Sequence, residues 1–76
     1  MKSYNVNLDS IDKIKGFVSA IQTCEGDIDL SSERYTVDAK SIMGIFSLDL
    51  AKQLRVDFHN DAVAEKVLPD LQKYIV

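Results

Sequence analysis

The feature that most constrains the fold is the changing spacing of apolar residues along the chain. Over residues 2–8 apolar and polar side chains alternate, which predicts a strand with one face on a core. Asp9 or Ser10 can then cap a helix that ends before Gly26. This helix is predicted because the apolar residues that follow recur at helical spacing: Ile11, Ile14, Phe17, Val18 and Ile21.

The middle of the chain repeats this change of period. Alternation over residues 27–30 and again over residues 35–39, separated by the turn-prone residues 31–34, predicts a hairpin. Ser41 is a candidate cap of a short helix that Gly44 weakens. Its apolar residues are Ile42, Ile45, Phe46 and Leu48. Alternation over residues 53–58 predicts a fourth strand.

A last helix is predicted after Asn60 or Asp61, either of which can cap it. Its apolar stripe consists of Val63, Val67, Leu71, Tyr74 and Ile75. Pro69 lies inside this pattern, where its ring would clash with the carbonyl of Glu65 and remove one hydrogen bond. We therefore expect a kink or a restart of the helix at Pro69.

The predicted order is β-α-β-β-α-β-α within one domain, residues 1–76. Because each strand has one apolar face, the helices should all cover the same side of a sheet. The expected fold is α+β, an open-faced sandwich of a four-stranded antiparallel sheet and three helices. We expect the bare face to be acidic and solvated, with no function of its own. It would carry Asn5, Asn7, Asp27, Asp29, Asp38, Arg55 and Asp57.

Composition excludes several classes of function. A net charge of −3 without a basic run argues against nucleic acid as a partner. No apolar stretch is long enough for a secretory signal or for insertion into a membrane. Cys24 is the single cysteine, so no internal disulfide can form and a cytoplasmic location is expected.

Catalytic and metal-binding constellations are also missing from the pattern. Cys24 has neither a second cysteine nor a nearby histidine, so it predicts no metal site and no catalytic pair. The carboxylates fall on alternating strand positions and do not converge. We expect no cofactor, no metal and no enzymatic activity.

Residues 35–48, and above all Lys40-Ser41-Ile42-Met43-Gly44, resemble the central segment of the HPr family, the phosphocarrier proteins of the sugar phosphotransferase system. The predicted order of elements is also that of the family. In the family, a Gly-[Leu/Ile]-His-Ala-Arg-Pro motif leads into the first helix, and its histidine carries the phosphoryl group. Here Leu8-Asp9-Ser10-Ile11-Asp12-Lys13 stands in that place.

An ungapped count from Lys40 puts Ser10 at the histidine position and Asp12 at the arginine position. A phosphoserine ester is not passed on as readily as a phosphoramidate, and the Asp12 carboxylate would repel a phosphoryl group. We therefore expect no catalytic residue. His59, the only histidine, ends the fourth strand away from Ser10 and is expected to be a surface or helix-capping residue.

Ser41 matches the serine that an ATP-dependent kinase phosphorylates in HPr proteins of Gram-positive bacteria. The resemblance implies a regulatory phosphorylation site, while a helix cap alone accounts for Ser41 equally well. It also implies a partner-binding surface of Lys40, Ile42, Met43, Ile45 and Phe46, although Ile42 could instead pack in the core.

Our leading hypothesis is a regulatory or adaptor protein that binds its partner through residues 10–14 and 41–46. The expected partners are phosphotransferase-system proteins, an HPr kinase or a transcription regulator. Two alternatives stay open at this point. One is an active phosphocarrier that uses Ser10 or His59 as its acceptor, and the other is a structural module that reuses the fold.

Overall fold

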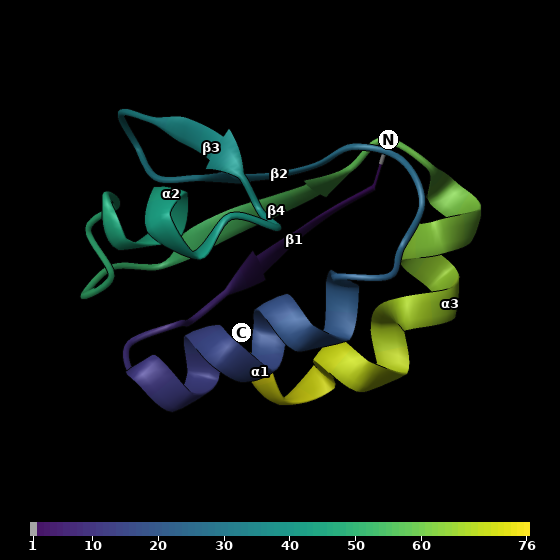
Figure 1. The fold of residues 1–76 in the computed structure, drawn as a ribbon, viewed down its shortest axis with the longest axis horizontal. Coiled ribbons are helices and arrows are strands. Elements are labelled where there is room, and N and C mark those ends of the chain that lie inside the picture. The colour runs from purple at the N-terminus through teal and green to yellow at the C-terminus, as the bar shows by residue number, and fades with distance from the viewer. Residues whose placement is uncertain (1) are drawn as a thin grey trace.

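The computed structural model describes residues 2–76, and its elements follow the predicted order (Figure 1). They are β1 (Lys2–Val6), α1 (Ile11–Ile21), β2 (Ile28–Ser31), β3 (Thr36–Asp38), α2 (Ile42–Phe46), β4 (Leu54–Phe58), α3 (Asp61–Leu71) and the 3-10 turn η1 (Gln72–Tyr74). The predicted α+β class is confirmed.

The four strands form one antiparallel sheet in the order β1-β4-β2-β3. In β1 and β4, Lys2 lies opposite Phe58 and Val6 opposite Leu54. In β2 and β4, Ile28 also lies opposite Phe58. The helices pack against one another and against one face of the sheet, and no element within residues 2–76 covers the other face (Figure 1).

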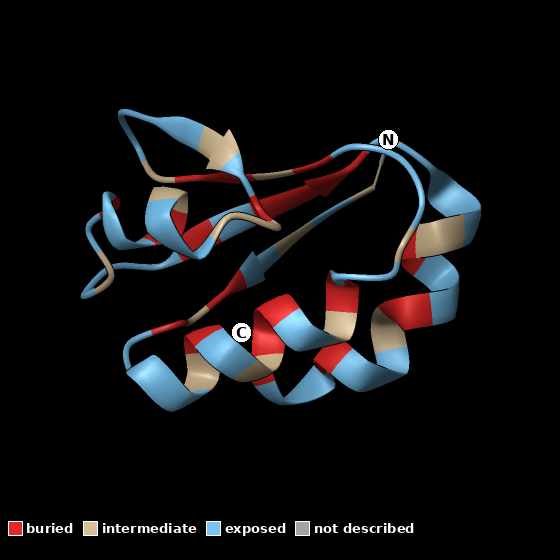
Figure 2. Ribbon diagram, in the orientation of Figure 1, coloured by how far each residue is buried: buried red, intermediate tan, exposed pale blue. Residues whose placement is uncertain are grey.

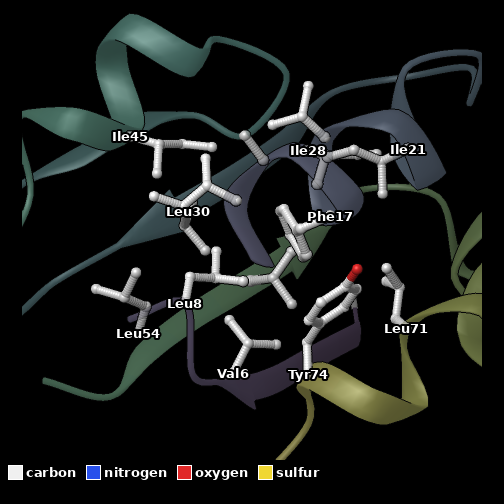
Figure 3. Packing of buried hydrophobic residues seen from close by; sticks show 14 of the residues in the cluster. Val6, Leu8, Phe17, Ile21, Ile28, Leu30, Ile45, Leu54, Leu71 and Tyr74 are labelled. Carbon is white, nitrogen blue, oxygen red and sulfur yellow. The ribbon is translucent and has the colours of Figure 1, made fainter. Parts of the chain in front are cut away.

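The core lies between this sheet and the helices, and it is built from the residues that carry the two apolar periods (Figure 2). Figure 3 shows side chains from β1, α1, β2, α2 and the C-terminal segment meeting there. The largest fully buried side chains are Phe17, Phe58, Leu8, Ile14, Ile21, Leu30, Ile45, Leu54, Leu71, Val6 and Val56. The alternation and the helical spacing therefore identified most of the core.

The two ends of the described chain meet at β1, which the sequence did not predict. β1 ends at Val6, because the Asn7 N–H donates to the carbonyl of Tyr74 (2.9 Å). Ile75 forms an antiparallel bridge with Val6, and the Val76 N–H donates to the carbonyl of Asn5 (3.0 Å). The prediction that Ile75 belongs to the last helix is therefore wrong.

Pro69 lies inside α3 and does not end it. The helix continues for two residues and gives way to the tighter η1 turn at Gln72. A proline removes one backbone hydrogen bond, and the change to 3-10 geometry follows soon after that loss. The predicted restart thus occurs after Pro69 and not at it.

Asp57 departs from the prediction of a solvated open face, because it is only 7% exposed. The Ser3 hydroxyl donates to its Oδ1 at 2.5 Å, and Arg55 Nε lies 3.1 Å from the same oxygen. A buried carboxylate needs such partners, since removal from water disfavours its charge. The prediction of a solvated Asp57 is wrong for this reason.

Candidate functional site

The first part of the site is the start of α1, where Ser10 is the N-cap. Its backbone is extended (φ −143°, ψ 157°), and its hydroxyl oxygen accepts from the Lys13 N–H at 3.2 Å. This contact satisfies one of the N–H groups that a helix leaves unpaired at its start. Of the two predicted caps, Ser10 therefore fills the position, and its side chain is exposed.

Carboxylates flank Ser10 on both sides. Asp9 Oδ1 lies 2.9 Å from Lys13 Nζ, and this hydrogen bond and the ammonium charge lower the pKa of Asp9. Asp12 lies in the first turn of α1 and is exposed. Negative charge at this end suits the helix dipole. The Lys13 ammonium in this turn is paired with Asp9.

The second part of the site is the start of α2, where Ser41 is the N-cap. Its hydroxyl oxygen accepts from the Gly44 N–H at 3.1 Å. A Cβ at Gly44 would lie 3.2 Å from the Cβ of Val37, closer than most such contacts. Both residues of the segment that resembles the HPr family therefore have local structural roles. Ser41 caps the start of α2, and Gly44 allows α2 to approach β3.

Lys40 also has a structural partner. Its ammonium donates to the carbonyl of Cys24 and lies 3.5 Å from the carbonyl of Gly26. Both carbonyls belong to the turn that follows α1, in which Gly26 has a positive φ of 83°. The Lys40 ammonium is therefore attached to the end of α1 and is not presented freely beside Ser41.

An exposed apolar patch covers the outer side of α2, and we call Ile42, Met43 and Phe46 the α2 patch. These side chains are 38%, 81% and 45% exposed. Ile42 therefore does not pack in the core. Ile45 is different: it is fully buried and points from α2 toward Leu30 (Figure 3). Placing Ile45 on the partner-binding surface was wrong, because one residue of this short helix must attach it to the core.

The start of α1 adds one more exposed apolar side chain, Ile11, which is 57% exposed. α1 and α2 contact each other, so the residues at 10–13 lie on a helix next to the one that carries the α2 patch. Ile14 faces the core and is 1% exposed. The residues of the predicted partner surface that are exposed or partly exposed are therefore Ser10 to Lys13 together with Ser41, Ile42, Met43 and Phe46.

The fold does not place His59 near Ser10. The register of β1 with β4 places it beyond Phe58, at the start of β1, whereas Ser10 lies beyond the other end of that strand. Its Nε2 is 2.8 Å from Asp29 Oδ2, and its side chain is 42% exposed. Asn60 caps α3, because its Oδ1 accepts from the Ala62 N–H at 3.0 Å. His59 is thus a surface residue and not the cap.

A comparison with protein-family models matches residues 12–76 to the family described as PTS HPr component phosphorylation site. This match covers most of the chain and agrees with the order of its elements. The chain belongs to the HPr family. HPr proteins are phosphocarriers that act with other proteins of the phosphotransferase system and are not enzymes in themselves. The curated proteins gave no match, and neither did the solved structures.

The match of this HPr-family chain begins at residue 12 and thus after Ser10. The likeness therefore lies in the helices and strands from α1 onward, and it does not include the segment that leads into α1. Residues 2–76 contain no group of three metal-ligating side chains. None of the helices described is long and apolar enough to cross a membrane.

Proposed function

We propose that this HPr-family protein is a cytoplasmic regulator or adaptor of the phosphotransferase system that binds other proteins and does not relay phosphate. The observation that carries the proposal is the chemistry at the start of α1. Ser10 caps the helix there with no histidine beside it, and Asp9 and Asp12 flank it. A serine ester would hold a phosphoryl group without passing it on.

The α2 patch supports binding to a protein. Met43 is 81% exposed, and its flexible, polarisable side chain adapts to the surface of a partner. Ile42, Phe46 and Ile11 add exposed apolar area on the two neighbouring helices. Exposed apolar clusters on a small soluble domain typically mark interaction sites. We propose phosphotransferase-system proteins, an HPr kinase or a transcription regulator as partners.

Ser41 is the proposed point of regulation. Its side chain is partly exposed at the edge of the α2 patch, so a phosphate there would change the charge of the proposed interface. In this reaction the γ-phosphoryl group of ATP passes to Ser41 Oγ. The bond to the leaving ADP breaks, and the proton of the hydroxyl is released. A hydrophobic partner surface would lose affinity for the modified protein.

The test is intact-protein mass spectrometry after two separate incubations, one with phosphoenolpyruvate and enzyme I and one with ATP and an HPr kinase. We expect no adduct from phosphoenolpyruvate and an acid-stable adduct on Ser41 from ATP. Ser41→Ala is the matched control for the second reaction. An acid-labile adduct from phosphoenolpyruvate on the unmodified chain would restore the phosphocarrier function.

A gain-of-function variant makes the first reaction informative. Ser10→His together with Asp12→Arg returns the two motif positions to the family residues on the same backbone. If enzyme I phosphorylates this variant and not the parent chain, the missing chemistry and not a lost docking surface explains the inactivity of the parent. Phosphorylation of both proteins would contradict the proposal.

A further inference from the structure

The Lys40 ammonium contacts backbone carbonyls just after α1, although Lys40 lies far from them in the sequence. The last turn of α1 contains no basic residue, so no local cation balances the carbonyls that a helix leaves unpaired at its end. Lys40, sixteen residues after Cys24, supplies this cation by donating to the carbonyl of Cys24 and lying within reach of Gly26. The start of α2 is thereby connected to the end of α1.

The backbone around Lys40 does not depend on this contact. The Lys40 N–H donates to Asp38 Oδ1 at 2.9 Å, and the Ser41 N–H donates to the carbonyl of Asp38 at 3.0 Å. Ala39 is fully buried and anchors the same turn. The long lysine stem can therefore change its partner while the turn before α2 stays in place.

A phosphate on Ser41 would compete for the ammonium. Consecutive Cα atoms are about 3.8 Å apart, so a phosphate on the next residue lies within the range of the Lys40 side chain. The phosphate would carry a charge of about −1.5 to −2. The present contacts already have an ionised donor, the Lys40 ammonium, but their acceptors, the carbonyls of Cys24 and Gly26, are neutral. A phosphate adds the Coulomb attraction of an opposite charge, so the carbonyls are the weaker competitors.

We propose that Lys40 transmits the phosphorylation state of Ser41 to the turn after α1. Phosphorylation draws the ammonium away from Cys24 and Gly26, and the turn at residues 24–26 loosens. This inference rests on the proposed regulation through Ser41. It assigns Lys40 as a positioning residue within the molecule, whereas the resemblance implied a direct contact with a partner.

The loosened turn borders a second surface. Ala20, Thr23, Cys24 and Glu25 form one wall of a groove of about 400 Å³ between α1 and α3. The Cys24 thiol is half-buried there, 4.0 Å from the carbonyl of Ala20. Since Cys24 is the only cysteine, its reaction with a thiol reagent reports on this turn alone.

The experiment measures the rate at which iodoacetamide alkylates Cys24 in the folded chain. The protein is made by chemical synthesis with serine or phosphoserine at position 41, so no kinase is needed. We expect phosphoserine to raise the rate by about two- to ten-fold, the factor for a local opening that loses one net hydrogen bond. A nearby negative charge disfavours the thiolate, the form of Cys24 that iodoacetamide alkylates. The charge of the phosphate therefore cannot by itself produce this rise in rate.

Lys40→Met should raise the alkylation rate of the unphosphorylated chain by a similar factor, and phosphoserine should then add nothing. Lys40→Arg retains a cation and should keep the rate low. Lys52→Met removes a lysine outside this contact and is the matched control. An unchanged or slower rate with phosphoserine, or a full additional effect of phosphoserine in Lys40→Met, would overturn the inference. If only the kinase reaction fails, the regulatory proposal falls, while the effect of phosphoserine on the turn at residues 24–26 remains a measured property of the fold.

Discussion

Gly16 lies on the face of α1 that meets Tyr74, and Gly16→Ala should destabilise the protein although alanine favours helices. An added methyl group would lie 2.1 Å from Tyr74 Oη and 3.3 Å from its Cζ. The Tyr74 ring is 6% exposed and packs edge-on against Phe17, with the ring centroids 6.0 Å apart. The ring must therefore move, and it would lose part of its buried contact.

The magnitude follows from two opposing effects. Gly to Ala inside a helix stabilises by about 1 kcal/mol. Overpacking of a buried site costs about 1–3 kcal/mol, and disturbing an aromatic pair costs about 0.5–1.5 kcal/mol more. We expect a net loss of about 1–3 kcal/mol in the free energy of unfolding. For a domain of this size, each kcal/mol lowers Tm by about 4–8 °C.

Tyr74→Phe provides the matched control, because it removes the atom that the methyl group would strike. No hydrogen bond of the Tyr74 hydroxyl is found within residues 2–76, so this change breaks no such bond and should cost less than Gly16→Ala. The double variant should recover most of the loss. The chain has no tryptophan, so urea unfolding followed by far-UV circular dichroism is the suitable assay. A Gly16→Ala variant more stable than the parent, or no recovery in the double variant, would refute this reasoning.

Three further predictions concern the site. Ser41→Ala removes a helix cap and should cost about 1 kcal/mol of unfolding free energy in chemical denaturation. Ile45→Ala should cost about 2–5 kcal/mol in the same assay and Met43→Ala about 0.5 kcal/mol or less, because only Ile45 is buried. The lowered pKa of Asp9 means that its contact with Lys13 stabilises the fold above the usual pKa of 3.8 and is lost as pH falls through the folded-state pKa. The stability difference between the parent and Asp9→Asn should therefore be present at neutral pH and disappear in acid.

The order and type of the elements could be predicted because they depend on local periodicity. Alternation and helical spacing are set by which face of each element meets the core. The same pattern could not show where pairing changes. The alternation continues past Val6 to Leu8, but the backbone of Asn7 pairs with Tyr74 and no longer with β4. Such a contact joins residues that are far apart in sequence.

The candidate site was predictable as a set of positions and less so in its contacts. For a helix of five residues, the sequence does not decide which apolar side chain turns inward, and this is why Ile45 was misplaced and Met43 was not. The role of Lys40 depends on Cys24 and Gly26 across the fold. The burial of Asp57 likewise involves a distant residue, since its partner Ser3 lies 54 residues earlier in the sequence.

The pairing of Ile75 and Val76 with β1 also affects how this molecule can meet others. Within the described chain, the edge of β1 is partly covered by these two residues, and the opposite edge is the three-residue strand β3. The Asp38 carbonyl of β3 is already occupied by the Ser41 N–H. These contacts shorten the backbone that is open to a foreign strand, and long open edges promote aggregation. The proposed partner would therefore recognise mainly side chains, and the sequence of that surface can diverge while the sheet beneath it is kept.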